Sequence, residues 1–268
     1  MSYKVDPLFK IVEIEINSAC NLACSYCPNR EFDRIEKGVM SLQDYDRIIS
    51  QLVEINFKGR ISHEFYGEPT LHPHYVEIVR RTKKALPDTS IQLYTNGTRL
   101  TKKLFTEILE AGLDTFIVTK QEETPSIVFD ETIKELSSKE MEHVQYRRHD
   151  EMILTNRGGA MPDIGLGAQH LLPCFVPTML ITITVKGSVL PCFEDFFQKH
   201  SMGNIFTEEL VDIWNKEEFV NFRKNLRSGL RHKYEACKNC NRIQTKIPEE
   251  FTEIREAYEL ERPKRKAT

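Results

Sequence analysis

The sequence lacks the features that would place the chain in a membrane or on a nucleic acid. It has no apolar run approaching the roughly 18 residues of a membrane span, and residues 1–6 form no apolar signal segment. Its 37 basic and 40 acidic residues leave a net charge of −3, which creates no general attraction to nucleic acid or anionic lipid. We therefore expect a cytoplasmic protein that binds neither nucleic acid nor membrane.

The sequence also contains no G-x-G-x-x-G motif, so nothing in it indicates a dinucleotide site. At 268 residues and 40% hydrophobic composition, the chain can bury one sizeable core and a small appended unit. It is too short for two large domains.

Cysteine is the informative residue type, because its seven copies fall into two sets. An early set has the spacing C-x3-C-x2-C and a late set has four members; the sets are Cys20, Cys24 and Cys27, then Cys174, Cys192, Cys237 and Cys240. Three thiolates hold a four-iron cluster by three corners and leave one iron open, whereas four thiolates close a site. The early set therefore indicates a reactive cluster, and the late set indicates an electron relay or a structural metal.

Zinc and disulfides are the alternatives. A zinc site at the early set lacks a fourth ligand, since no further cysteine or histidine occurs before His63. The late set suits a four-cysteine zinc site as well as a cluster, and its spacing alone does not decide between them. Disulfides are disfavoured because we expect a compartment that keeps thiols reduced.

Strand-like and helix-like segments alternate over the first two thirds of the chain, which predicts an α/β fold with a parallel sheet. The expected strands cover residues 11–17, 60–65, 91–95 and 115–119, and the expected helices begin after Ser41 and cover residues 74–86 and 101–110. In barrel-like folds, ligand sites lie at the carboxyl ends of strands. The early cysteines, Gly67, Glu68 and Asn96 all follow such strand ends.

The pattern changes after about residue 160. Residues 180–185 and 188–190 predict a hairpin flanked by Cys174 and Cys192, and residues 207–226 predict one or two helices with Trp214 in the core. We expect domains at residues 1–165 and 166–250 and a C-terminal tail at 251–268, whose basic stretch 262–266 is solvated.

These motifs carry a resemblance to the radical S-adenosylmethionine (SAM) enzymes. The cysteine triplet has an aromatic residue, Tyr26, before its last cysteine, and residues 65–69 (FYGEP) resemble the family's Gly-Gly-Glu segment, with Tyr66 in place of the first glycine. Residues 94–97 (YTNG) resemble the strand end beside the SAM ribose. The resemblance implies that the open iron binds SAM and that the following residues contact it: Tyr26, Tyr66, Gly67, Glu68, Pro69, Asn96 and Thr119.

The late cysteines resemble the family's Twitch module, a shortened SPASM domain. They occur with the segments GSVLPC at 187–192, MGNI at 202–205, IW at 213–214 and FR at 222–223. The resemblance implies a partial (β/α)6 TIM-like barrel followed by a small Twitch unit, a β-hairpin plus helix, that holds an auxiliary 4Fe-4S cluster rather than zinc.

Within the family, the spacing of the late cysteines is similar to that of alcohol dehydrogenases of aminoglycoside-type antibiotic biosynthesis. The resemblance implies that a 5′-deoxyadenosyl radical removes a hydrogen atom from a secondary alcohol of an aminocyclitol or amino sugar, and that the auxiliary cluster takes the electron as the ketone forms. The implied partners are a polyol or aminoglycoside-type substrate and an external one-electron reductant such as flavodoxin or ferredoxin. Arg157, Glu194 and Tyr66 are the candidate catalytic residues. Arg157 orients hydroxyls but is a weak base, since guanidinium stays protonated, and Glu194 binds an amine or accepts a proton.

Other functions stay open. A sugar epimerase returns a hydrogen atom, commonly from a thiol, yet all seven cysteines are assigned to clusters, so its donor would be a tyrosine such as Tyr66 or Tyr94. A small-molecule dehydratase also stays open, because it would differ from a dehydrogenase in where its active-site groups lie, which the sequence does not show. A zinc-binding interaction module leaves the SAM-like segments unexplained.

Overall fold

The computed structural model describes residues 8–121, 127–167 and 171–259. The strands are β1 (Ile11–Ile14), β2 (Arg60–His63), β3 (Ser90–Thr95), β4 (Thr115–Lys120), β5 (Val144–Arg148), β6 (Leu180–Ile183), β7 (Ser188–Leu190) and β8 (Gly203–Asn204). The α-helices are α1 (Leu42–Glu54), α2 (Tyr75–Ala85), α3 (Lys102–Glu110), α4 (Val128–Thr132), α5 (Ser138–Met141), α6 (Val176–Met179), α7 (Leu210–Asn215), α8 (Glu217–Arg227), α9 (Glu235–Lys238) and α10 (Thr252–Glu259). The predicted strands and helices of the first 120 residues are confirmed, with ends shifted by a few residues.

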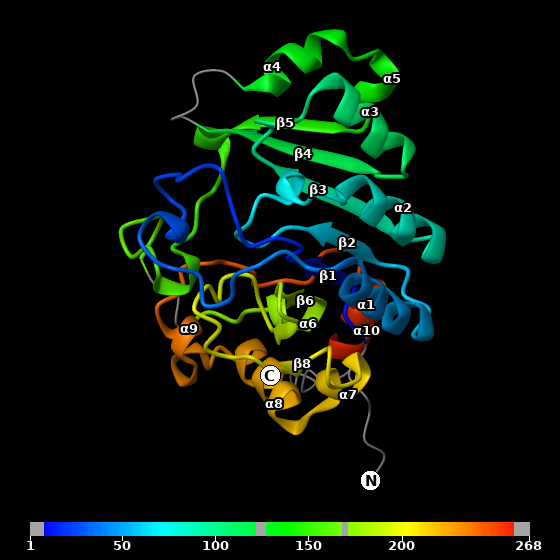
Figure 1. Ribbon diagram of the computed structural model, residues 1–268. Helices are drawn as coiled ribbons and strands as arrows, with labels where there is room; N and C mark the ends of the chain where they lie inside the picture. The colour runs from blue at the N-terminus through cyan, green and yellow to red at the C-terminus, as the bar shows by residue number, and fades with distance from the viewer. Residues whose placement is uncertain (1–7, 122–126, 168–170, 260–268) are drawn as a thin grey trace.

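All strands join one sheet in the order β5-β4-β3-β2-β1-β6-β7-β8 (Figure 1). The pairs from β5 to β6 are parallel, and β7 and β8 extend the sheet with antiparallel pairs. The central strand β1 is buried along its whole length, as expected for a parallel strand covered on both faces.

Helices α1, α2 and α3 lie together along one face of β1 to β4 (Figure 1). The side chains of Ser41 and Thr101 cap α1 and α3 by accepting from the backbone N–H of Asp44 (3.0 Å) and Leu104 (3.2 Å). His63 points into this helical layer, where its ring nitrogens meet the hydroxyls of Tyr45 (2.8 Å) and Tyr75 (3.2 Å). Burial lowers the pKa of His63 to about 3, so it is a neutral core residue.

The opposite face of the parallel strands lines a cleft. Because side chains alternate along a strand, each strand contributes residues two apart to this face. The cleft-lining residues of the six parallel strands and their ends include Ile11, Glu13, Arg60, Glu64, Tyr94, Thr119, Arg147 and Leu180. The expected α/β partial barrel is thus confirmed, with β1 to β5 in consecutive order and a sixth parallel strand, β6, beside β1.

The hairpin expected in the small C-terminal unit forms from β6 and β7, but it belongs to the main sheet. Strand β6 pairs with β1 from Ile11↔Leu180 to Ile14↔Ile183. A strand predicted for the second unit therefore completes the fold of the first. The domain boundaries at 165 and 250 stay a prediction.

The predicted helices of residues 207–226 are confirmed as α7 and α8. Trp214 is fully buried, as predicted, with its ring 5.2 Å from Phe9 and 5.1 Å from Phe219.

The segment expected as a C-terminal tail begins with a helix. Residues 252–259 form α10, and Ile254 is fully buried and packs with Met179. The tail boundary at residue 251 stays a prediction. The basic stretch 262–266 lies outside the described residues.

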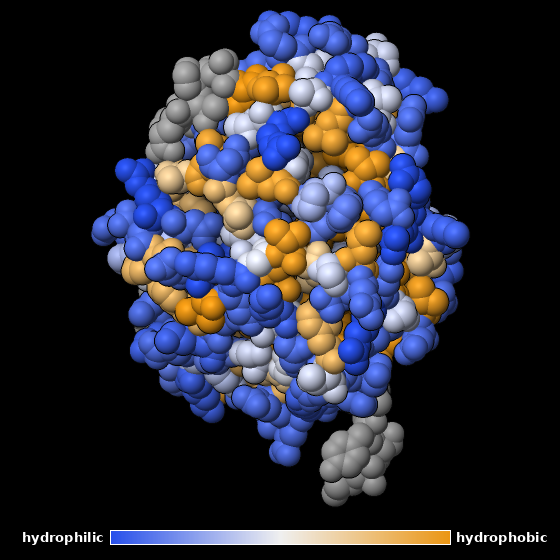
Figure 2. All heavy atoms as spheres, in the orientation of Figure 1, coloured by the Kyte–Doolittle hydropathy of each residue, from blue (hydrophilic) through white to orange (hydrophobic). Residues whose placement is uncertain are grey.

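Within the described ranges, no helix has the length and apolar character to cross a membrane. On the face shown in Figure 2, apolar residues lie in separate patches among hydrophilic ones.

Candidate functional site

The cleft collects almost all of the residues predicted to hold the first cluster and SAM. It is bounded by the loop after β1, the segment after β2 and the ends of β3 and β4. The predicted residues in its lining are Cys20, Cys24, Cys27, Tyr26, Tyr66, Gly67, Glu68, Asn96 and Thr119. Pro69 follows Glu68 in the sequence and begins a 3-10 turn, Pro69–Leu71, whose first two residues are buried.

The cysteine loop is held by short-range hydrogen bonds. The backbone N–H of Cys27 donates to the carbonyl of Cys24 (3.0 Å), and the sulfur of Cys20 accepts from the N–H of Leu22 (3.5 Å) and from the amide of Asn96 (3.9 Å). Partial desolvation raises the pKa of Cys20 and Cys27, so a bound cation would favour their ionised form. Three thiols on one loop, facing a cleft, fit a cluster with one open iron.

Gly67 and Glu68 are fixed by contact with the chain that precedes the cysteines. A Cβ atom at Gly67 would lie 1.7 Å from the carbonyl oxygen of Asn17, so only glycine fits there. The N–H of Glu68 donates to the carbonyl of Ala19 (2.8 Å). This close packing requires glycine at position 67, which corresponds to the second glycine of the family's Gly-Gly-Glu segment.

The carboxylate of Glu68 is buried and precisely oriented. One oxygen accepts from Thr70 Oγ1 (2.6 Å) and Thr95 Oγ1 (2.7 Å), and the other accepts from the N–H of Asn96 (2.9 Å). The second oxygen has capacity for another donor. Its position beside the cysteine loop suits an ammonium group such as that of SAM's methionine moiety.

Tyr26 and Thr119 lie near each other at the end of β4. The Tyr26 hydroxyl donates to Gln121 Oε1 (2.8 Å), and Thr119 Oγ1 accepts from Arg147 Nε (3.2 Å). Asn96 Nδ2 donates to Asn21 Oδ1 (2.9 Å), which ties the end of β3 to the cysteine loop. The predicted SAM contacts thus come from three strand ends.

Arg157 lies on the wall of the cleft between two tyrosines. Its guanidinium carbon is 5.9 Å from the Tyr26 ring and 6.0 Å from the Tyr66 ring, which are cation–π distances. Burial alone would lower the pKa of Arg157, but the neighbouring Tyr66, Glu194 and Cys27 raise it overall. Its Nε, though buried, has no hydrogen-bond partner among the described residues, so it is a donor available to a bound polar group.

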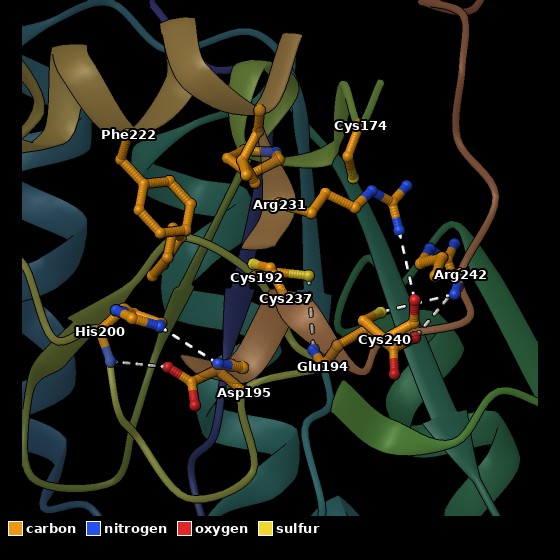
Figure 3. Close-up of a pocket in the computed structure, with 14 residues that line it drawn as sticks. Cys174, Cys192, Glu194, Asp195, His200, Phe222, Arg231, Cys237, Cys240 and Arg242 are labelled. Carbon is orange, nitrogen blue, oxygen red and sulfur yellow. Dashed lines mark hydrogen bonds and ion pairs between the residues drawn. The ribbon is translucent and has the colours of Figure 1, made fainter. Parts of the chain in front are cut away.

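The four late cysteines line a second, enclosed cavity (Figure 3). Its other walls are half apolar and half titratable: the apolar residues are Pro177, Pro191, Phe222, Leu226 and Ala236, and the titratable ones are Glu194, Asp195, His200, Arg231 and Arg242. Burial raises the pKa of all four thiols, that of Cys240 to about 12. Four thiols around one cavity, two of them buried and two half-buried, fit a metal centre, whose positive charge would favour their ionised form.

Glu194 lies in the partition between the two cavities. It is 3% exposed and lines the four-cysteine cavity, and its carboxylate accepts from Thr155 Oγ1 (2.8 Å) and forms an ion pair with Arg242 (3.4 Å). Thr155 and Arg242 both line the cleft. Glu194 itself does not line the cleft, so its predicted contact with the substrate stays a prediction.

Sequence reasoning missed a set of charged residues on the floor of the cleft: Glu13, Arg60, Glu64, Arg147 and Arg242. Glu64 is half-buried, and desolvation raises its pKa to about 7 against the lowering effect of the nearby arginines. Desolvation also raises the pKa of Glu13 well above its ordinary value. The available signal was the period-two polar pattern of Arg60, Ser62 and Glu64 in a strand, which is unusual for a buried parallel strand.

Comparison with known proteins agrees with this geometry. Residues 14–139 match the radical SAM superfamily, and residues 174–241 match the SPASM iron-sulfur cluster-binding domain. The chain is 40% identical over 247 residues to the S-adenosyl-L-methionine-dependent 2-deoxy-scyllo-inosamine dehydrogenase of Niallia circulans, covering 92% of this chain and 98% of that protein.

Two solved structures are similar over nearly the whole chain. BtrN in complex with AdoMet and 2-DOIA has a TM-score of 0.87 at 40% identity, covering 92% of this chain and 98% of its own. BtrN in an open conformation has a TM-score of 0.71 at 37% identity, covering 89% and 94%. The chain therefore belongs to the radical SAM enzymes, which bind SAM at a 4Fe-4S cluster, and it carries a SPASM-type domain for an auxiliary iron-sulfur cluster.

Proposed function

We propose that this enzyme oxidises a secondary alcohol of an aminocyclitol or amino sugar to a ketone, in the biosynthesis of an aminoglycoside-type natural product. The cofactors supply a 5′-deoxyadenosyl radical at the first site and an electron acceptor at the second. The protein binds the alcohol between them, orients its carbinol carbon and removes the proton. The relative from Niallia circulans, a dehydrogenase of 2-deoxy-scyllo-inosamine by name, supports this choice of substrate class.

The observation that carries the proposal is the shared wall of the two cavities. Arg242 lines both of them. The Tyr66 hydroxyl, in the cleft, donates to the carbonyl of Phe193, the residue directly after Cys192 (2.9 Å). A radical formed in the cleft therefore lies close to the four-cysteine cavity, and oxidation of a carbinol radical to a ketone needs exactly such a neighbouring electron acceptor. A zinc module requires no such arrangement.

Arg157 and the charged floor are the groups we assign to the substrate. Arg157 has a free Nε–H and a planar fork of donors, which suit vicinal hydroxyls. The acidic groups of the floor and partition, Glu13, Glu64 and Glu194, suit the ammonium of an amino sugar. Arg157 for the hydroxyls and the acidic groups for the ammonium together fit a polyol that carries an amine.

The proton released on ketone formation requires an acceptor. Glu64 lines the cleft, and within the described part of the chain its carboxylate makes no hydrogen bond or ion pair with protein. A carboxylate with a pKa of about 7 is well matched to accept a proton near neutral pH. Glu194 is held by Thr155 and Arg242, so we assign the acceptor role to Glu64 and a binding role to Glu194.

We also assign an external one-electron reductant, such as flavodoxin or ferredoxin, to the first site. Cys20 is exposed, so the cysteine loop is reached directly from the surface. Electron delivery from a protein donor requires such an approach.

The test is anaerobic incubation of the reconstituted enzyme with SAM, a reductant and a panel of aminocyclitols and aminoglycosides that includes 2-deoxy-scyllo-inosamine. We expect 5′-deoxyadenosine together with loss of two hydrogens from one substrate class. Substrate deuterated at the carbinol carbon should pass its label to 5′-deoxyadenosine. Solvent deuterium at that carbon in a product of unchanged redox state would replace the dehydrogenase by an epimerase, and loss of water would replace it by a dehydratase.

A further inference from the structure

Arg231 is a buried arginine at the four-cysteine cavity whose charge has no carboxylate partner. It begins the 3-10 turn Arg231–Lys233 and is 1% exposed. Among the described residues, no aspartate or glutamate forms an ion pair with it, and its guanidinium donates only to backbone carbonyls. Burying an uncompensated charge is costly, so such a residue needs a negative group nearby.

The carbonyls that hold Arg231 belong to both sides of the cysteine cavity. Nε donates to the carbonyl of Leu172 (2.9 Å), Nη2 to that of Pro173 (3.2 Å) and Nη1 to that of Cys240 (3.5 Å). Two of these residues directly precede Cys174, and the third is itself a cavity cysteine. Figure 3 shows the side chain reaching across between Cys174 and the Cys237–Cys240 side. The positive charge is therefore fixed in place relative to Cys174 and Cys240.

The other arginine of the cavity differs. Arg242 is paired with Glu194 (3.4 Å), so its charge is largely balanced within the protein. Two buried carboxylates, Glu194 and Asp195, also line the cavity, but among the described residues neither forms an ion pair with Arg231.

We infer that Arg231 is a positioning residue that raises the reduction potential of the auxiliary cluster and thereby lets it take up an electron from the substrate radical. An added electron increases the negative charge on the cluster and its four thiolates by one. In a poorly solvated cavity, a fixed positive charge beside these sulfurs favours the reduced form. The inference rests on the proposed relay role of this site, but the potential is measurable without any substrate.

The test uses the full-length chain with the three early cysteines replaced by alanine, so that the auxiliary cluster alone contributes to the spectrum. Arg231→Gln removes the charge and keeps a polar side chain, whereas Arg231→Lys keeps the charge and loses the fork. Arg223→Gln is the matched control, because Arg223 is equally buried in the same unit but lies on Trp214 (3.8 Å) and does not line the cavity. Each protein is titrated with reductant and followed by electron paramagnetic resonance, with iron and sulfide content measured alongside.

We expect the constant for one-electron reduction to fall at least tenfold in Arg231→Gln, about 59 mV in potential, with a clearly smaller change in Arg231→Lys and none in Arg223→Gln. Loss of the cluster from Arg231→Gln alone, with a near-normal potential in Arg231→Lys, also supports the role of the charge. An unchanged potential in a cluster-loaded Arg231→Gln would overturn the inference. Equal losses in the Lys and Gln variants would overturn it too, because they would reduce Arg231 to a backbone clamp. Absence of product from the enzyme that keeps all seven cysteines, with the potentials of the variants as expected, would instead count against the proposed function.

Discussion

Replacing Arg34 by methionine should destabilise the protein strongly and in a pH-dependent way. Arg34 is 8% exposed and forms a two-point ion pair with the buried carboxylate of Glu15, at 2.6 and 3.0 Å. Its guanidinium also lies 5.0 Å from the Phe65 ring and 5.4 Å from the Tyr66 ring. The pair thus connects the segment after the early cysteines to β1 and to the FYGEP segment.

Removal of one partner leaves the other charge buried, which typically costs about 3–5 kcal/mol. For a chain of this size, 3 kcal/mol corresponds to a fall in melting temperature of roughly 6–12 °C. Burial already raises the pKa of Glu15 despite Arg34, and loss of Arg34 should raise it further. A carboxyl with a raised folded-state pKa costs stability above that pKa and costs nothing below its ordinary value. The penalty should therefore be full at pH 8 and shrink as the pH falls toward 4.5.

The assay is urea unfolding at several pH values, followed by the fluorescence of the single, buried Trp214. Arg81→Met, which removes an exposed ion pair with Asp46, is the control and should have a much smaller effect. Adding Glu15→Gln to Arg34→Met should recover part of the loss at pH 8. A loss below about 1 kcal/mol, or one that is equal at both ends of the pH range, would refute the reasoning.

Four further outcomes test the site. Reconstituted enzyme should hold about eight irons, and replacement of the three early cysteines by alanine should leave about four; tightly bound zinc with little iron would contradict this. Replacing Cys237 and Cys240 by alanine should spare SAM cleavage but abolish ketone formation, with circular dichroism to check folding; full product yield would remove the relay. Arg157→Lys keeps the positive charge but loses the planar guanidinium. It should lower turnover roughly tenfold or more while both clusters stay intact. Turnover of this variant at the wild-type rate would show that Arg157 does not position the alcohol. In the wild type, the rate of ketone formation should rise as the pH passes about 7, where Glu64 loses its proton. The Glu64→Gln variant should be slow and should lack this rise. A pH profile of Glu64→Gln that matches the wild type would exclude Glu64 as the proton acceptor.

The sequence by itself determined the two sets of cysteines that are predicted to hold the clusters. Cys20, Cys24 and Cys27 lie within eight residues of each other, so their covalent spacing brings them onto one loop in almost any fold. The same holds for the segment from Gly67 to Pro69 and for the helix caps Ser41 and Thr101, because each of these signals is local. The period of the apolar residues was enough to predict the first four strands and their helices.

The tertiary structure decided what surrounds those sites. Strand β6 joins β1 across more than 160 residues of chain, and such a pairing depends on which edge of the sheet is open rather than on the strand's own residues. Glu64 gains its raised pKa only because the cleft removes water from it, and Glu194 comes to lie between two cavities only through Thr155 and Arg242. Arg231 carries no local signal at all: its position follows from carbonyls at Leu172, Pro173 and Cys240 that folding brings together. Desolvation and long-range pairing arise from the packed chain as a whole, and local spacing does not encode them.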